Sequence, residues 1–322
     1  MTDVPVFPVV PLPNVEPGAD RRAGIADTID AWTGSAAMSA LLVAFGHPSP
    51  LPGPLGPRLD ELERFTAEHW NFREGRERHQ ARRVDFAPEV DELIRAAATS
   101  LGLAGRQTPA HRSYDHLLVL GGGVRTSVAR ADFAASVLRA GVVTGTVAGL
   151  GGTRPLVDQE DAVREIGLRD CPTEGDAVDE GLRRAFALGE PTRRRSGETE
   201  LGEGWWVRSY LDRQPAVHAL AVASSRPGQR ANTADSLFGW AEMAEPAEGE
   251  RLLLVTTDLF VPFQHCDAVH MLGLRHGCSI DTVGLDAAVS PWLPPSRTDA
   301  VVQEIRSAVL SVRALYRRIE GL

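Results

Sequence analysis

The sequence contains no lysine, and all 34 of its basic residues are arginine. Pyridoxal phosphate enzymes and Schiff-base aldolases bind their cofactor or substrate through a lysine amine, so this chain has neither chemistry. The phosphate-binding P-loop, which also needs a lysine, is absent. A basic surplus is lacking too, because 43 acidic residues give a net charge of −9. This charge argues against nucleic acid as a partner.

Cysteines are few, and long apolar runs are missing. Cys171, Cys266 and Cys278 form no C-x-x-C pair, which argues against a metal cluster and against a disulfide framework. The nine histidines show no H-E-x-x-H spacing, so we expect no metal site. The apolar run at residues 36–45 is too short to span a bilayer. We therefore expect a cytoplasmic protein without a signal peptide or a membrane span.

The first 112 residues read as a helical region with an extended, proline-rich start at residues 1–20. Apolar spacing predicts a helix over residues 27–45, which ends at the proline- and glycine-rich segment 46–57. Further helical patterns cover residues 58–70 and 87–103. No convincing series of strands precedes residue 113.

From residue 113 to residue 322, apolar strand-like runs alternate with helical patterns. Such alternation predicts an α/β fold, a Rossmann-like parallel sheet with helices on both faces. The segment near residues 190–214 interrupts the alternation, so we interpret it as an insertion or an added hairpin. Ligands of such sheets bind at the carboxyl ends of the strands.

A glycine turn follows the first predicted strand in HLLVLGGGVRTSVAR, residues 116–130. Its spacing is G-x-G-x-x-T, and free backbone N–H groups at a strand-to-helix turn form an anion cradle. A dinucleotide site also needs an acidic residue at the end of the second strand. That strand ends in Gly151 and Gly152, and no Asp or Glu occurs between Phe133 and Asp158. The glycines therefore hold another anion or only permit close packing of strand and helix.

Five motifs in this order, LGGGVRTSVARADFA, GLGGTRPL, TEGDAVDEGLRRA, SSRPGQRANTADSL and LVTTDLFVPFQHCDAV, resemble the YdcF/SanA/ElyC-like family over about residues 115–285. That family is a Rossmann-like domain of largely unknown function. The resemblance implies a nucleotide-like ligand, such as S-adenosylmethionine. Two departures stand out. The family's usual His and Arg after the strand LVTT fall at Phe260 and Phe263, and its Ser before an N-T pair falls at Arg230.

Individual residues of this sequence match positions in the family's motifs. Arg130 matches an arginine on the first helix, Glu174 or Asp176 matches the acidic start of a later helix, and Asn232 with Thr233 matches an N-T pair. Arg130 could equally form a surface ion pair, and Asn232 could cap the helix that follows it. We expect ligand contacts from Gly121, Gly122, Gly123, Arg125, Thr126, Arg130, Gly151, Gly152, Asn232, Thr233, Thr257 and Gln264.

These observations lead to a hypothesis of a small-molecule enzyme that binds an anionic, nucleotide-like ligand in the glycine-rich cleft. Glu174 and Asp258 are its expected acid–base residues, with transferase or hydrolase-like chemistry. The alternative is a non-catalytic ligand-binding or regulatory protein related to cell-envelope factors. The sequence leaves open whether the protein is a homo-oligomer.

Overall fold

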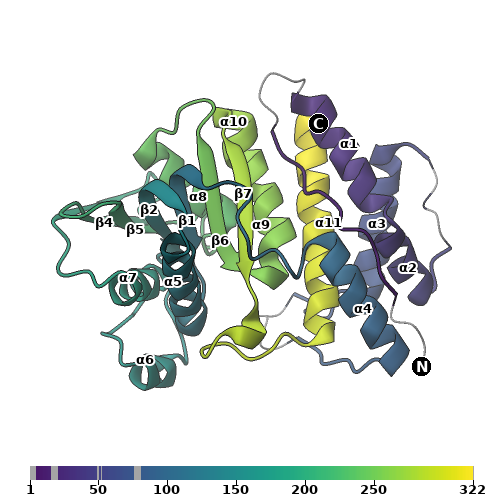
Figure 1. The fold of residues 1–322 in the computed structure, drawn as a ribbon, viewed down its shortest axis with the longest axis horizontal. Helices are drawn as coiled ribbons and strands as arrows, with labels where there is room; N and C mark the ends of the chain where they lie inside the picture. Colours follow the sequence, from purple (N-terminus) through teal and green to yellow (C-terminus); the bar gives the residue numbers. More distant parts are fainter. Residues whose placement is uncertain (1–4, 16–20, 49–50, 52, 76–80, 322) are drawn as a thin grey trace. The chain divides into compact units, whose positions relative to one another are not determined.

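The computed structural model describes residues 5–15, 21–48, 51, 53–75 and 81–321 (Figure 1). The chain divides into two compact units. The helical unit takes in residues 1–106, 258–270 and 295–322, and the α/β unit takes in residues 107–257 and 271–294. The domain boundary expected at residue 112 stays a prediction.

The helical unit is built around the long C-terminal helix. This helix, α11, contacts α1, α3, α4 and α9 of the same unit. Its buried face carries Val302, Ile305, Val309 and Val312, which recur at helical spacing. Within the described ranges, no helix is both long and apolar enough to cross a bilayer. The helices of the unit are α1 Arg21–Thr33, α2 Ala36–Ala44, α3 Leu55–His69, α4 Pro88–Leu101, α9 Val261–Ala268 and α11 Thr298–Glu320.

The prediction of a single helix over residues 27–45 is wrong, because the chain forms two helices there. Helix α1 ends at Thr33, and α2 begins at Ala36. The Ser35 side chain accepts the backbone N–H of Met38 at 3.2 Å, so Ser35 is the N-cap of a new helix. The apolar spacing continues across the break, and spacing alone does not reveal it.

The α/β unit contains a seven-stranded sheet in the order β3-β4-β5-β2-β1-β6-β7. The pairs among β5, β2, β1, β6 and β7 are parallel, which confirms the predicted parallel sheet. The segment near residues 190–214 forms an antiparallel hairpin that extends the sheet beside β5. The strands are β1 Ser113–Leu120, β2 Val143–Gly152, β3 Arg193–Glu198, β4 Gly204–Tyr210, β5 Ala216–Val222, β6 Arg251–Thr257 and β7 Ser279–Leu285.

Helices cover both faces of this sheet. On one face, α5 and α7 pack against a core that includes Leu117, Val147 and Val255. On the other face, the ring of Trp240 in α8 makes an edge contact with His116, with ring centroids 5.1 Å apart. Adjacent residues of a strand point to opposite faces, as Leu117 and His116 do here. The helices are α5 Val124–Arg139, α6 Glu160–Ile166, α7 Glu174–Ala185, α8 Thr233–Ala244 and the short α10 Leu274–His276.

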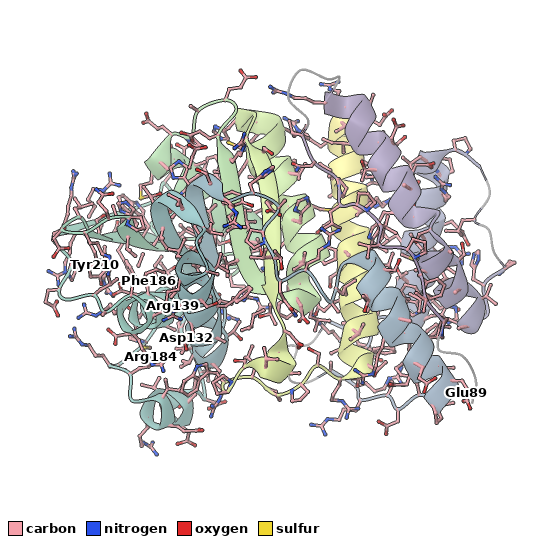
Figure 2. The ribbon with its side chains drawn as sticks, in the orientation of Figure 1. Glu89, Asp132, Arg139, Arg184, Phe186 and Tyr210 are labelled. Atoms are coloured by element: carbon pink, nitrogen blue, oxygen red, sulfur yellow. The ribbon has the colours of Figure 1, made fainter. Side chains whose placement is uncertain are left out.

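Side chains of α5 and α7 also join the two helices directly. Asp132 on α5 and Arg184 on α7 lie side by side (Figure 2), and Arg184 Nη1 donates to Asp132 Oδ2 at 2.8 Å. The Trp292 indole N–H donates to the same Asp132 oxygen at 2.9 Å. These bonds fix the helix pair that faces the glycine turns.

The strand order places a topological switch point between β1 and β6. Strands β2 and β5 lie beyond one edge of β1 in the sheet, and the later strands β6 and β7 lie beyond its other edge. In open sheets of this kind, the crevice outside the carboxyl ends of the two central strands receives the ligand. Residues Gly121–Gly123 follow β1, and Thr257 ends β6. The first predicted ligand residues therefore lie at this point.

Candidate functional site

The first glycine turn brings β1 and β2 close together. The N–H of Gly121 donates to Leu150 O at 2.7 Å. A Cβ atom at Gly121 would lie 2.5 Å from that carbonyl oxygen, and one at Gly123 would lie 2.8 Å from Gln159 Oε1. The Leu150 oxygen belongs to the backbone, so packing alone requires glycine at Gly121, whereas a side chain at Gly123 would only displace the flexible end of Gln159.

A protein side chain already binds the N-terminus of α5. Gln159 Oε1 accepts the N–H of Val124 at 2.7 Å, where the sequence predicts an anionic ligand. Arg125 pairs with Glu165, and the methyl group of Thr126 lies against Gly122. The ligand contacts expected from Gly121, Gly122, Gly123, Arg125 and Thr126 stay predictions.

Arg130 is buried at the switch point, with 2% of its surface exposed. Its Nη1 donates to Leu120 O at 2.8 Å and to Gly121 O at 2.6 Å, and its Nε donates to Thr257 Oγ1 at 3.1 Å. These bonds join the carboxyl end of β1 to that of β6. Arg130 thus holds the glycine turn in place through hydrogen bonds to its backbone carbonyl groups. The ligand role expected for Arg130 and Thr257 stays a prediction.

The second glycine turn lies where β2 meets the N-terminus of α7. A Cβ atom at Gly151 would lie 2.7 Å from the Cα of Gly175, so helix and strand touch through their backbones. Thr173 caps α7 in a capping box with Asp176. Of the two acidic residues that the sequence left open, Asp176 belongs to this cap, and Glu174 is turned toward the glycine turn.

Glu174 lies beside Arg154 in a mostly buried setting. The N–H of Glu174 donates to Arg154 O at 3.0 Å, which holds the two residues next to each other. Arg154 Nε lies 3.7 Å from Glu174 Oε2, and the Glu174 side chain is 16% exposed. Arg154 Nε is shielded from solvent and makes no hydrogen bond within the described part of the chain.

The pKa of Glu174 reflects its burial. Desolvation raises this pKa above its usual value, while Arg154, Arg130 and Arg230 and the N–H of Gly152 act in the opposite direction. Desolvation is the largest of these effects, because burial penalises the charged form more than the arginines favour it. Glu174 therefore retains its proton to a higher pH than an ordinary glutamate does.

We expect Glu174→Gln to make the protein more stable at neutral pH. A carboxyl group whose pKa is raised by folding stabilises the fold at low pH, and that contribution is lost as pH rises through the folded-state pKa. Glutamine carries no charge to desolvate, so the stability of the variant should fall less than that of the wild type as pH rises above 4.5. Urea unfolding at several pH values measures this difference. Parallel stability curves for the two proteins would contradict the assignment.

Asn232 acts as the N-cap of α8. Its side chain accepts the N–H of Asp235 at 3.1 Å, and Asp235 Oδ2 accepts the N–H of Asn232 at 2.9 Å. This reciprocal pair is a capping box, one of the two roles that the sequence left open. Thr233 is the first residue of the helix. Ligand contacts from Asn232 and Thr233 stay predictions.

Asp258 and Gln264 belong to the helical unit, whereas Glu174 belongs to the α/β unit. Asp258 is buried, and its Oδ1 accepts the N–H of Leu259 at 2.7 Å. Gln264 is a buried residue of α9. We therefore build the candidate site from the α/β unit alone, and the roles expected for Asp258 and Gln264 stay predictions.

Sequence reasoning missed Arg154 and Gln159. Arg154 is part of the motif GLGGTRPL, two residues after Gly152, but no pattern indicates that its Nε is buried beside Glu174. Gln159 lies in a loop 35 residues from Val124, and its contact with α5 depends on the folded path of that loop. The signal available for Arg154 was its position directly after a glycine turn at the end of a strand.

The parallel strands of the α/β unit therefore define a Rossmann-like α/β protein with a mostly buried acid at the carboxyl edge of its sheet. A family model described as the Rv3785 N-terminal domain matches residues 16–102. The whole chain is 27% identical over 350 residues to the uncharacterized protein Rv3785 of Mycobacterium tuberculosis (strain ATCC 25618 / H37Rv), with 97% of that relative covered. The uncharacterized protein Mb3814 of Mycobacterium bovis is equally similar over the same length. No solved structure matches the chain.

These comparisons show that the resemblance to the YdcF/SanA/ElyC-like family is wrong. The matching family model is that of the Rv3785 N-terminal domain, and the similar proteins extend over the whole chain. The shared motifs have a structural cause here. Glycines at strand ends and capping boxes at helix starts are what a Rossmann-like sheet needs locally, so they recur without a common family.

Proposed function

We propose that the α/β unit binds an oxyanion of a small molecule, a carboxylate or a phosphate, between Arg154 and Glu174. The observation that supports this proposal is the buried Arg154 Nε, which has no acceptor among the described residues. An unsatisfied buried N–H group costs about 1–3 kcal/mol. An oxygen of the ligand would accept this hydrogen bond.

Arginine side chains supply positive charge at this point. Helix α7 begins at Glu174, and the N-terminus of a helix attracts anions. Arg154, Arg130 and Arg230 all act electrostatically on the Glu174 carboxyl group. A protonated Glu174 would donate a hydrogen bond to the ligand oxygen, whereas an ionised one would repel it. Binding should therefore be tighter at low pH and should take up a proton.

A glutamic acid with a raised pKa also suits general acid catalysis. In this proposal Glu174 gives its proton to the leaving-group oxygen of the bound molecule as that bond breaks. Water, in a hydrolase-like reaction, or a hydroxyl of a second substrate, in a transferase-like one, forms the new bond, and its proton returns to Glu174. The alternative is a binding protein without turnover. Conversion of a bound ligand during prolonged incubation, followed by mass spectrometry, separates the two functions.

The binding test uses thermal unfolding in the presence of inorganic phosphate, succinate, ATP and glucose 6-phosphate. A ligand that binds only the folded protein raises the Tm. We expect at least one of these oxyanions to raise the Tm of the wild type, and Arg154→Gln to abolish the increase. Arg164→Gln is the matched control, because Arg164 is an exposed arginine on α6 of the same unit.

Two results would contradict the proposal. One is an increase in Tm that Arg154→Gln leaves unchanged. The other is the absence of any increase with all four oxyanions at millimolar concentration.

A further inference from the structure

A pocket lies on the other side of β5 from α7. It has a volume of about 480 Å³ and is bounded by the β3–β4 hairpin, β5 and α8. Pockets of about 300–1,000 Å³ hold small organic ligands. Glu174 and Arg154 do not line this pocket, so it is separate from the oxyanion site proposed above.

Two glycines shape the walls of the pocket. A Cβ atom at Gly197 would lie 2.8 Å from Cζ2 of Trp205, a residue that lines the pocket, so glycine at position 197 leaves room for the indole ring beside β3. A Cβ atom at Gly239 would lie 2.5 Å from Val222 Cγ1, so α8 packs closely on β5. The two close contacts leave an apolar space between the hairpin and the helix, with Trp205 on one side.

Large apolar side chains are exposed at the pocket. Phe238 is 43% exposed and Leu201 is 49% exposed, and both line it. The Arg275 guanidinium lies over the Phe238 ring, 5.9 Å from its centroid, and restrains that ring. Single exposed apolar residues are ordinary on protein surfaces. Here they adjoin a cavity with a Trp205 wall, which is the arrangement of a binding site for an apolar ring.

The charges at the pocket select against anions. Exposed Glu200 and Glu242 line it, against one arginine, Arg195. Asp235 also lines it and accepts the backbone N–H groups of Ser225 and Asn232. The three acidic side chains would repel an anionic ligand, whereas they would not lower the affinity of an uncharged ligand.

We propose that this pocket is a second binding site, which takes an uncharged apolar molecule containing at least one flat ring. Its ring contacts Trp205 and Phe238, and the rest of its surface contacts the aliphatic floor formed by Leu220 and Val222. This site does not depend on the oxyanion site between Arg154 and Glu174.

The test uses the full chain and the uncharged dye Nile red, with the anionic dye 8-anilinonaphthalene-1-sulfonate for comparison. We expect saturable Nile red fluorescence with one dye per chain and weaker binding of the anionic dye. Phe238→Ala should weaken Nile red binding about tenfold, because a large apolar contact is lost. Leu201→Ser should weaken it as well. Val143→Ser is the control, because Val143 is an exposed residue of β2 that does not line the pocket.

Energy transfer from tryptophan provides a second measurement. Trp205→Phe should keep an apolar ring in place and lower the transfer from protein to dye. Equal affinity of Phe238→Ala and the wild type for Nile red would overturn the proposal. A second result would also overturn it: the wild type binds no dye and is a dimer, and Phe238→Ala is a monomer. The surface around Phe238 would then join two copies of the chain. Phosphate binding in Phe238→Ala should stay unchanged, which separates this site from the first.

Discussion

Arg130→Met is expected to lower the free energy of unfolding by about 4 kcal/mol, because it leaves buried acceptors without donors. The substitution removes the hydrogen bonds to Leu120 O, Gly121 O and Thr257 Oγ1. Methionine keeps much of the side-chain volume, so the loss reports on the bonds more than on packing. Urea unfolding followed by circular dichroism measures the change.

Arg139→Met is the matched control on the same helix. Arg139 is an exposed residue of the last turn of α5 (Figure 2). Its interaction with the helix dipole contributes less than about 1 kcal/mol. If Arg130→Met were no more destabilising than Arg139→Met, Arg130 would not hold the glycine turn, and a ligand role for its guanidinium would regain support.

Gly175→Ala is expected to destabilise the protein by about 3 kcal/mol through overpacking. A Cβ atom at Gly175 would overlap the Cβ of Ala221 and lie 3.0 Å from Trp206 Cζ2. Both neighbours belong to the sheet, so the N-terminus of α7 would have to move away from it. Because Glu174 precedes this residue, the same displacement should weaken oxyanion binding.

Two further variants make this prediction specific. Gly189→Ala should change stability by less than about 0.5 kcal/mol, because no atom lies within 4 Å of a Cβ built there. The double variant Gly175→Ala, Ala221→Gly should recover much of the loss, since it removes the overlapping methyl group. If the double variant were as unstable as the single one, close packing would not be the reason for glycine at position 175.

The sequence is sufficient to predict the α/β fold. The alternation of strand and helix patterns after residue 113 predicts the parallel sheet that the structure contains. Local signals of this kind depend on residues a few positions apart. The break between α1 and α2 was missed because it interrupts no apolar spacing.

The inward direction of Arg130 could not be predicted. Its partner Thr257 is 127 residues away, and Gln159 reaches α5 from a loop 35 residues away. Contacts over such separations depend on the completed fold. The same limit explains the mistaken family resemblance, because glycine turns and capping boxes describe local geometry and carry little information about ancestry.

In our proposal an oxyanion binds beside Arg154 and Glu174 rather than in the first glycine turn. Crystals soaked in selenate test it most directly, because anomalous scattering from selenium locates the bound anion. We expect the anomalous peak within hydrogen-bonding reach of Arg154 Nε in the wild type and its loss in Arg154→Gln. A peak at the N-terminus of α5, beside Val124 and Gly123, would contradict the account.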